Sequence, residues 1–465
     1  MKLNRSAHEP KGLNSNLYYG KYKLSDICSM DNMDYKQIIV FWKEFNIPNT
    51  LERTIKVEMD TEFINTISGP RRAGKTYLCF QLINKLLEKG ISKENIVYIN
   101  FEDNKLLGAD STDLDKLVET IFELSNVNKK QKIYLFFDEI QTVKNWDSWA
   151  RTMNDTRKDI QIILTGSSSK LLSKEISTKL RGRVLNYEVF PLSFKEILNW
   201  KNIKYDLKTI SHSRDKIEIK KLFSKFVSDG GYPATISQSM QKENILQSYY
   251  DSMIFKDIVE RHKIEDVNKL KALANVLFGS VSKEMSYTKL TNKLTSIGFR
   301  ISKNTVIEYI SYFEDAYLFF QNVKYEYSLA KQLGSIKKIY CIDNGLLNAV
   351  SFKFSDDFGK LLENVVFIEL RRRNEQTYYY RNKYECDFII VRKNKVSSAI
   401  QVTKKISDEN EKREMNGILE AMKEYKLNEG IILTEEKEKE ITIEGKKIKI
   451  IPIWKWLLEK SDRFK

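Results

Sequence analysis

Between about residues 62 and 200, short unbroken apolar runs alternate with segments of helical apolar spacing. The runs have the length of strands but lack the polar–apolar alternation of a strand with one face in water. Continuous apolar strands separated by helices are typical of a parallel sheet that helices cover on both faces. The pattern therefore predicts an α/β domain, with strands at Phe63–Ser68, Ile96–Phe101, Lys132–Phe137 and Gln161–Thr165.

The pattern changes after residue 200. Residues 201–281 have helical spacing, interrupted at 230–233 by Gly-Gly-Tyr-Pro, and two short helices and a hairpin are expected over residues 282–350. A long helix from about residue 355 leads into sequence rich in predicted strands. We therefore expect an N-terminal arm and helix over residues 1–50, the α/β domain over 51–200, a helical lid over 201–281, a helix-and-hairpin domain over 282–350 and a second α/β domain over 351–465.

Composition narrows the choice of compartment. Of the 465 residues, 42% are apolar and 30% are charged, which excludes a largely disordered chain. The four cysteines lie far apart and there are only three histidines, so neither a disulfide framework nor a thiolate or histidine metal site is expected. With no secretory leader and no apolar run of 18 residues, we expect a cytoplasmic protein without a transmembrane helix.

The net charge bears on the partner. Lys and Arg exceed Asp and Glu by 78 − 63 = 15. Such an excess favours a polyanion, with DNA as the expected case, and it is equally typical of a lysine-rich solvated surface. Charge alone therefore leaves the partner open.

One segment has the spacing of a phosphate-binding loop. Residues 69–76 fit the pattern G-x-x-x-x-G-K-[ST], follow a predicted strand and open a predicted helix, a context that disfavours a fortuitous glycine-rich turn. Backbone N–H groups in such a loop close around phosphate oxygens. We expect Lys75 to contact the β- and γ-phosphates and to act in catalysis, and the Thr76 hydroxyl to bind Mg²⁺. The expected nucleotide-binding residues are Gly69, Pro70, Arg71, Arg72, Ala73, Gly74, Lys75, Thr76 and Tyr77.

A second chemical signal lies at the end of the third predicted strand. The apolar run delivers Asp138 and Glu139 at its carboxyl end, where ligands bind in open α/β sheets. We expect Asp138 to bind Mg²⁺ and Glu139 to orient and deprotonate the attacking water. Taken alone, these residues would be read as an exposed acidic turn, but the phosphate-binding loop upstream favours the catalytic interpretation.

The fourth predicted strand ends in polar residues that suit a sensor of the γ-phosphate. Thr165 and Ser167 are the candidates, and capping of a following helix by a serine is the alternative. Further along, Arg183 and its neighbour Arg181 are candidates for neutralising charge in the transition state, from the same chain or from a neighbouring subunit. A pair of surface arginines is the alternative.

These stretches resemble archaeal and bacterial AAA-type P-loop ATPases that carry a restriction-endonuclease-like C-terminal domain of unknown function. The resemblance covers about residue 60 to the end of the chain. It implies a P-loop ATPase domain with ATP rather than GTP as the nucleotide, although the residues themselves do not settle the base. The stretches that carry it are 69–76, 137–141 with Trp146, 164–169, Gly182-Arg183 leading to 190–194, 230–233, 359–364 and 385–388.

The resemblance also implies where a nuclease-type metal site would lie in the C-terminal domain. That site takes a Glu from a helix, an Asp from a strand and Glu-x-Lys from the next strand, around a divalent metal ion. Glu363 and Asp387 match the first two, but Gln401 stands where the Glu is expected and Thr403 where the Lys is expected. Lys404 is one position off and should point to the other face of the strand. We therefore expect a degenerate fold without robust nuclease activity.

Residues 282–350 have the pattern of a winged helix. Ser286–Leu294 and Ser302–Phe313 are the expected helices of a helix-turn-helix, and Tyr325–Lys338 is the expected wing. DNA contact is expected at the start of the second helix, and a helical lid that binds no DNA is the alternative. The local basic excess comes from Lys283, Lys289, Lys293, Arg300 and Lys303.

The leading hypothesis is an Mg²⁺-dependent ATPase whose nucleotide state gates a winged-helix and nuclease-like module on DNA. It is compatible with a homo-oligomer. The alternative is a slow ATP-dependent switch that acts through protein–protein contacts without DNA, motivated by the lack of a secure arginine finger. A third hypothesis, an active nuclease, requires metal-dependent cleavage that is abolished by Asp387→Ala.

Overall fold

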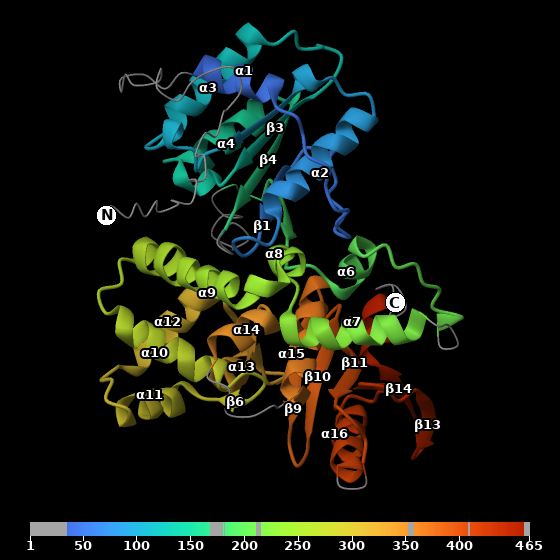
Figure 1. Cartoon of the computed structure of the whole chain (residues 1–465). Coiled ribbons are helices and arrows are strands. Elements are labelled where there is room, and N and C mark those ends of the chain that lie inside the picture. The colour runs from blue at the N-terminus through green and yellow to red at the C-terminus, as the bar shows by residue number, and fades with distance from the viewer. Residues whose placement is uncertain are drawn as a thin grey trace, which may run out of the picture.

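The computed structural model describes residues 35–167, 180, 182–210, 215–351, 358–407 and 410–459. The expected N-terminal arm, Arg181 and the two serines at 168 and 169 lie outside these residues. Figure 1 shows an upper part built around one sheet and a lower part that contains the other described sheets, with α8 and α9 where the two parts meet. None of the described helices is long and apolar enough to cross a membrane.

The upper part confirms the predicted parallel α/β domain. Its five strands have the order β2-β3-β4-β1-β5, and each neighbouring pair is parallel. Buried residues fill β1, β3 and β4, because helices cover both faces of the sheet. The strands are β1 (Ile64–Ser68), β2 (Ile96–Asn100), β3 (Ile133–Asp138), β4 (Ile160–Gly166) and β5 (Val184–Glu188).

Strand β5 was not among the predicted strands. It is the edge strand beside β1, and all five of its residues remain partly or fully exposed. An edge strand needs no continuous apolar run, so the pattern of hydrophobic positions does not reveal it. The helices of this domain are α1 (Tyr35–Glu44), α2 (Lys75–Glu88), α3 (Ser111–Leu124) and α4 (Trp146–Thr156).

A helical segment connects the upper domain to the rest of the chain. It comprises α6 (Phe194–Trp200), α7 (Asp215–Asp229), α8 (Pro233–Ser237), α9 (Lys242–Ser252), the π-helix η8 (Met253–Glu260) and α10 (Val267–Phe278). The break that the sequence predicted falls between α7 and α8. There a Cβ on Gly231 would lie 2.2 Å from the Leu192 carbonyl oxygen, so the chain passes too close to the segment before α6 for a side chain.

The next segment has a small antiparallel sheet with the order β6-β8-β7. Helices α11 and α12 match the two helices predicted here, and the Ser302 hydroxyl caps α12 by accepting from Thr305 N. The expected wing differs in one respect, because the short helix α13 lies between its strands. The elements are β6 (Glu284–Met285), α11 (Tyr287–Ser296), α12 (Lys303–Asp315), β7 (Phe319–Val323), α13 (Leu329–Gly334), β8 (Lys337–Cys341) and α14 (Asn344–Val350).

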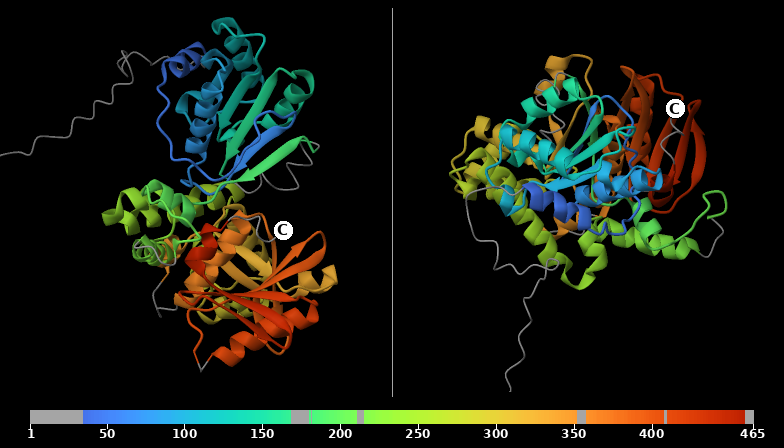
Figure 2. Two further views of the ribbon diagram at one scale, coloured as in Figure 1. Left: turned by 90° about the vertical axis from the view of Figure 1, so that its right-hand side faces the viewer. Right: turned by 90° about the horizontal axis from the view of Figure 1, so that it is seen from above.

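The C-terminal domain is a mixed six-stranded sheet with the order β13-β14-β12-β11-β10-β9. Its apolar core on the α15 side is continuous with that of the preceding helices. Figure 2 shows, from a second side, that this sheet and the upper sheet lie at opposite ends of the molecule. The elements are α15 (Phe358–Arg372), β9 (Gln376–Arg381), β10 (Glu385–Arg392), β11 (Lys395–Val402), α16 (Glu411–Glu424), β12 (Glu429–Thr434), β13 (Lys439–Ile443), β14 (Lys446–Pro452) and α17 (Ile453–Leu458).

Candidate nucleotide site

The loop between β1 and α2 has the backbone of an anion cradle. Gly74 adopts a left-handed conformation (φ 98°) directly before Lys75, where α2 begins. A Cβ on Gly69 would lie 2.1 Å from the Val189 carbonyl oxygen, so only glycine fits there. The first N–H groups of α2 have no carbonyl partner within the helix, and they attract an anion placed at the loop.

A buried ion pair fixes this loop from outside. Arg53 donates to the Ala73 carbonyl oxygen (2.9 Å), to the Phe190 carbonyl oxygen (2.7 Å) and to Glu196 Oε1 (3.0 Å). Burial acts to raise the pKa of Glu196, but the guanidinium of Arg53 and further donors outweigh it and lower the pKa to about 2. The pair is therefore ionised at neutral pH and holds the loop against α6.

Lys75 is buried beneath the loop and makes only long contacts. Its Nζ lies 3.2 Å from Gly69 O, 3.4 Å from Pro70 O and 3.3 Å from Glu139 Oε1. Burial acts to raise the pKa of Glu139, but Lys75 and a hydrogen bond from Gln141 outweigh it, so the pKa lies below its ordinary value. Glu139 is thus an ionised carboxylate that can accept a proton.

Hydroxyl groups from three elements converge on Asp138 at the end of β3. Thr76 Oγ1 donates to Asp138 Oδ2 over 2.6 Å, and Tyr98 OH donates to the same oxygen over 2.7 Å. The Thr165 hydroxyl donates to Asp138 Oδ1 and accepts from Glu139 N. Carboxylate and hydroxyl oxygens are the ligands that Mg²⁺ prefers beside phosphates, so Thr76 and Asp138 fit the expected ion.

Ser167 and Arg71 meet a carboxylate that comes from the helical segment. Asp257, on η8, accepts from Arg71 Nε at 3.0 Å through both oxygens and from Ser167 Oγ at 3.2 Å. Arg261, one turn further on, adds a contact at 3.6 Å. Asp257 is only 1% exposed, and burial raises its pKa although both arginines oppose this. The structure thus brings the loop, the end of β4 and η8 together at one carboxylate.

Two further predicted nucleotide contacts, Arg72 and Tyr77, differ in their surroundings. The guanidinium of Arg72 lies 6.0 Å from the centre of the Tyr249 ring on α9. Tyr77 is 57% exposed on α2 and contacts Phe80 edge to face. Neither residue contributes to the buried cluster around Lys75 and Asp138, and both stay predicted nucleotide contacts.

The structure places Arg183 apart from the loop. Its backbone precedes β5, and Ile64 N donates to its carbonyl oxygen at the amino end of β1. The loop follows the carboxyl end of β1, on the order of 15 Å away at 3.3 Å per residue. Arg183 instead pairs with Asp155 at 2.5 Å. This position does not suit a role in the chain's own site, and only the role toward a neighbouring subunit stays a prediction.

The candidate nuclease residues form a second cluster, far from the loop. Glu363 on α15 and Asp387 on β10 surround the ammonium of Lys338, which comes from β8 outside the C-terminal domain. The Lys338 Nζ distances are 3.0 Å to Glu363 and 2.9 Å to Asp387, and Glu385 lies 2.5 Å away. Burial and the charge of Asp387 raise the pKa of Glu363 above its ordinary value, although the ammonium of Lys338 opposes this.

The remaining candidates of that domain lie beside the cluster. Gln401 accepts from Asp387 N at 3.2 Å and donates to Glu414 Oε2 at 2.7 Å. Thr403 is buried, whereas Lys404 is exposed and lies over the Phe358 ring. Gln401 therefore joins a hydrogen-bond chain to a buried carboxylate on α16.

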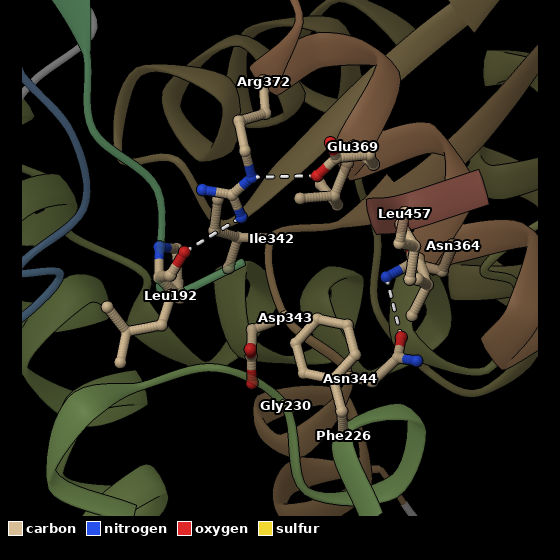
Figure 3. Close-up of a pocket in the computed structure, with 13 residues that line it drawn as sticks. Leu192, Phe226, Gly230, Ile342, Asp343, Asn344, Asn364, Glu369, Arg372 and Leu457 are labelled. Carbon is tan, nitrogen blue, oxygen red and sulfur yellow. Dashed lines mark hydrogen bonds and ion pairs between the residues drawn. The ribbon is translucent and has the colours of Figure 1, made fainter. Parts of the chain in front are cut away.

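A cavity lies between the helical segment and the C-terminal domain, apart from both clusters. Figure 3 shows Arg372 reaching Glu369, and Asn364 hydrogen-bonded to Asn344. Asp343 also lines it and accepts from Gly231 N at 2.7 Å, and burial raises the pKa of Asp343 to about 6. These pairs connect the Gly-Gly-Tyr-Pro segment to α14 and α15, so the cavity belongs to the junction between domains.

Sequence reasoning missed Asp257 and Lys338. Asp257 lies three and four residues from Ile254 and Met253, so it shares their buried helical face. Lys338 lies two residues before Tyr340 on β8, so both side chains are on the same face of the strand. A charged residue in register with buried apolar neighbours was the available signal in each case.

Three family descriptions match successive parts of the chain: an AAA domain over residues 61–198, a domain of unknown function (DUF8612) over 220–357 and another (DUF4143) over 358–456. Uncharacterized protein MJ1544 of Methanocaldococcus jannaschii is 39% identical over 421 residues, which cover 88% of this chain and 91% of that protein. The chain belongs to the family of that protein. An uncharacterized protein of Haemophilus influenzae is 33% identical, over 88% of this chain and 98% of its own length.

Solved structures resemble this chain more distantly than these relatives do. The Walker-type ATPase PABY2304 of Pyrococcus abyssi is 12% identical, covers 66% of this chain and 99% of its own, and has a TM-score of 0.41. The Aeropyrum pernix ORC1 protein in complex with DNA is 10% identical, covers 62% and 86%, and has a TM-score of 0.28. The AAA-domain match, together with the five-stranded parallel sheet, gives residues 61–198 the fold of an AAA-type P-loop ATPase domain.

Proposed function

We propose that the chain binds ATP with Mg²⁺ at the β1–α2 loop and hydrolyses it. The observation that carries this proposal is the meeting of Lys75 with Glu139 and of Thr76 with Asp138 at one end of the parallel sheet. An ammonium, a hydroxyl and two carboxylates at an anion cradle are the groups that phosphoryl transfer to water requires.

Each residue has a distinct task in this proposal. Lys75 contacts the β- and γ-phosphate oxygens in place of its long carbonyl contacts. Thr76 and Asp138 hold Mg²⁺, which neutralises charge on the phosphates. Glu139 orients the attacking water and accepts its proton, because it is an ionised carboxylate. Thr165, bonded to Asp138 and to Glu139 N, positions both acids relative to the γ-phosphate.

The nucleotide state reaches the helical segment through Asp257. The γ-phosphate competes with this carboxylate for Arg71 and Ser167, because both are donors beside the loop. Loss of these contacts frees η8, whose π-helical form is itself a feature often found at functional sites. Nucleotide binding then changes how the upper domain holds the helical segment.

DNA is the proposed partner of the β6–β8 region, which we interpret as a winged helix. Its element order, two helices followed by a sheet hairpin, supports this interpretation. Lys289, Lys293 and Lys303 are exposed around α11 and the start of α12. Duplex DNA binding with a steep dependence on salt is expected, and it should weaken when Lys289 and Lys293 are replaced by Glu.

The second candidate function, a slow switch read by other proteins, is favoured by the position of Arg183. With that arginine at the amino end of β5, opposite to the end of the strands that carries the loop, the chain's own site lacks its charge for the transition state. The decisive experiment measures ATP turnover with and without duplex DNA across a salt series. Turnover that DNA stimulates supports the coupled ATPase, whereas slow turnover that is indifferent to DNA supports the switch.

The C-terminal domain is proposed to have a nuclease-like fold without nuclease activity. Gln401 and Thr403 in place of the expected Glu and Lys support this proposal. No cleavage of duplex DNA is expected with Mg²⁺ or Mn²⁺. Cleavage that Asp387→Ala abolishes would contradict it.

A further inference from the structure

We propose that Lys338 is a built-in cation that fills the carboxylate cluster of the C-terminal domain and keeps divalent metal ions out of it. The cluster consists of Glu363, Glu385 and Asp387, which come from α15 and β10. The lysine comes from β8, which belongs to the small sheet of the preceding segment. The proposal concerns a site that takes no part in the proposed ATPase reaction, and it goes beyond that function.

The contacts of the ammonium are saturated. A protonated lysine has three donor positions, and Lys338 Nζ lies 3.0, 2.5 and 2.9 Å from one oxygen each of Glu363, Glu385 and Asp387. The side chain is 1% exposed, so water does not compete for these contacts. The ammonium therefore occupies the point where the three carboxylates converge.

Other donors also bind oxygens of the cluster, including the Glu363 oxygen that Lys338 contacts. Tyr340 OH donates to Glu363 Oε1 at 2.7 Å, and Val402 N donates to Asp387 Oδ2 at 2.9 Å. A divalent ion at this point would need the oxygens that Lys338 already binds, at 2.0–2.6 Å instead of about 3 Å. The metal ion and the ammonium thus exclude one another.

Lys338 also joins two parts of the chain. Its strand pairs with β6 and β7, while its charge is neutralised by carboxylates of the C-terminal domain. If either the lysine or the carboxylates were removed, the other would be left as a buried charge without a counter-ion, which would lower the stability of the fold. The lysine and the acidic cluster therefore depend on each other, and neither is a free site in the intact chain.

The test compares Mn²⁺ binding by the full-length chain, without nucleotide, in the wild type and in Lys338→Gln. We expect the wild type to have no Mn²⁺ site that is lost on Asp387→Asn. Lys338→Gln should gain about one equivalent of bound Mn²⁺ per chain by titration calorimetry, and the further change Asp387→Asn should remove it. Lys337→Gln, the neighbouring residue on β8, is the matched control and should gain none.

A second readout keeps the proposal falsifiable if Lys338→Gln is poorly folded. Mn²⁺ should then raise the unfolding temperature of Lys338→Gln but leave that of the wild type unchanged. Lys338→Arg retains the positive charge and should bind no Mn²⁺. An Asp387-dependent Mn²⁺ site in the wild type would overturn the proposal, as would the absence of both gained binding and thermal stabilisation in Lys338→Gln. These results are independent of ATP turnover, so they separate this proposal from the proposed function.

Discussion

Among the residues that the structure describes, two buried lysines face carboxylates, and their contacts differ. Lys75 lies at a helix N-terminus, with one carboxylate at 3.3 Å and two backbone carbonyls at 3.2 and 3.4 Å. Lys338 lies on a strand, with three carboxylates between 2.5 and 3.0 Å. Both side chains are almost fully buried, at 5% and 1% exposure.

The difference teaches which lysine is available for a ligand. The contacts of Lys75 are long, and a phosphate placed in the neighbouring backbone cradle offers it shorter ones. Lys338 has no donor left for a ligand, and its removal would leave like charges together. The first lysine is therefore part of a binding site, whereas the second takes the place of a bound cation. The predictions below first test this contrast and then the groups that surround the nucleotide site.

Lys75→Ala should lower kcat/KM for ATP by at least about 100-fold, because it removes the ammonium that stabilises charge on the phosphates. Steady-state release of phosphate measures this effect. Lys338→Gln, in the other cluster, should retain turnover within about threefold of the wild type, on the scale of 0.6 kcal/mol. Equal losses in the two variants would remove the contrast between the two lysines.

Glu139→Gln should lower kcat by on the order of 100-fold or more while ATP still binds, because the amide cannot accept a proton from water. Filter binding of labelled ATP together with turnover assays separates the two effects. Glu102 lies outside the loop and accepts a hydrogen bond from Arg71. Glu102→Gln is therefore the control, and its turnover should persist. Undiminished hydrolysis in Glu139→Gln would contradict the role of the base.

Lys338→Met should destabilise the C-terminal domain by about 3–5 kcal/mol, because Glu363 and Asp387, whose side chains are largely shielded from water, lose their counter-ion. Hydrogen exchange of β10 amides under native conditions reports this local stability. Lys337→Met should cost less than about 1 kcal/mol, since that side chain is only partly buried and contacts backbone carbonyls. A similar loss in both variants would argue against a special role for Lys338.

Glu196→Gln should lower stability at pH 7 by on the order of 3 kcal/mol, from the pKa of about 2 against an ordinary 4.5. Since the pKa is lowered in the folded state, this contribution is fully present above pH 4.5 and is lost as the pH falls toward 2. Stability of the wild type should therefore rise with pH across that window, and the rise should be smaller in Glu196→Gln. Urea unfolding at a series of pH values measures it, with exposed Glu52→Gln as the control.

Asp257→Asn should raise ATP affinity about fivefold, which corresponds to a small coupling free energy. The reason is that the amide competes less well than the carboxylate with the γ-phosphate for Arg71 and Ser167. Calorimetric titration with a non-hydrolysable ATP analogue measures the change. Asp251→Asn on α9, where the carboxylate is exposed, should leave affinity unchanged. Weaker binding in Asp257→Asn would show that the carboxylate supports the nucleotide site instead of competing with it.

The sequence predicted the parts that depend on local pattern. Continuous apolar runs predicted four of the five parallel strands, and the spacing of Gly69, Gly74 and Lys75 predicted the loop between β1 and α2. The edge strand β5 escaped because one of its sides faces away from the sheet and its residues remain accessible. Local pattern also left the position of Arg183 open, because the direction of β5 relative to β1 depends on strand pairing and not on residue spacing.

The contacts between distant segments could not be predicted in the same way. Asp257 meets Arg71 across 186 residues, and Lys338 meets Asp387 across 49. No rule of sequence spacing predicts either contact, because each contact is determined by how the domains pack together. A buried charge within an apolar face is visible in the sequence, but its partner becomes known only when the fold is known.

The central claim is that ATP with Mg²⁺ binds at the loop around Lys75, and titration calorimetry of the full-length chain tests it most directly. The account predicts heat of binding for the wild type and for Lys338→Gln, but none for Lys75→Ala. Binding of equal affinity in Lys75→Ala, or no heat with the wild type, would contradict the account.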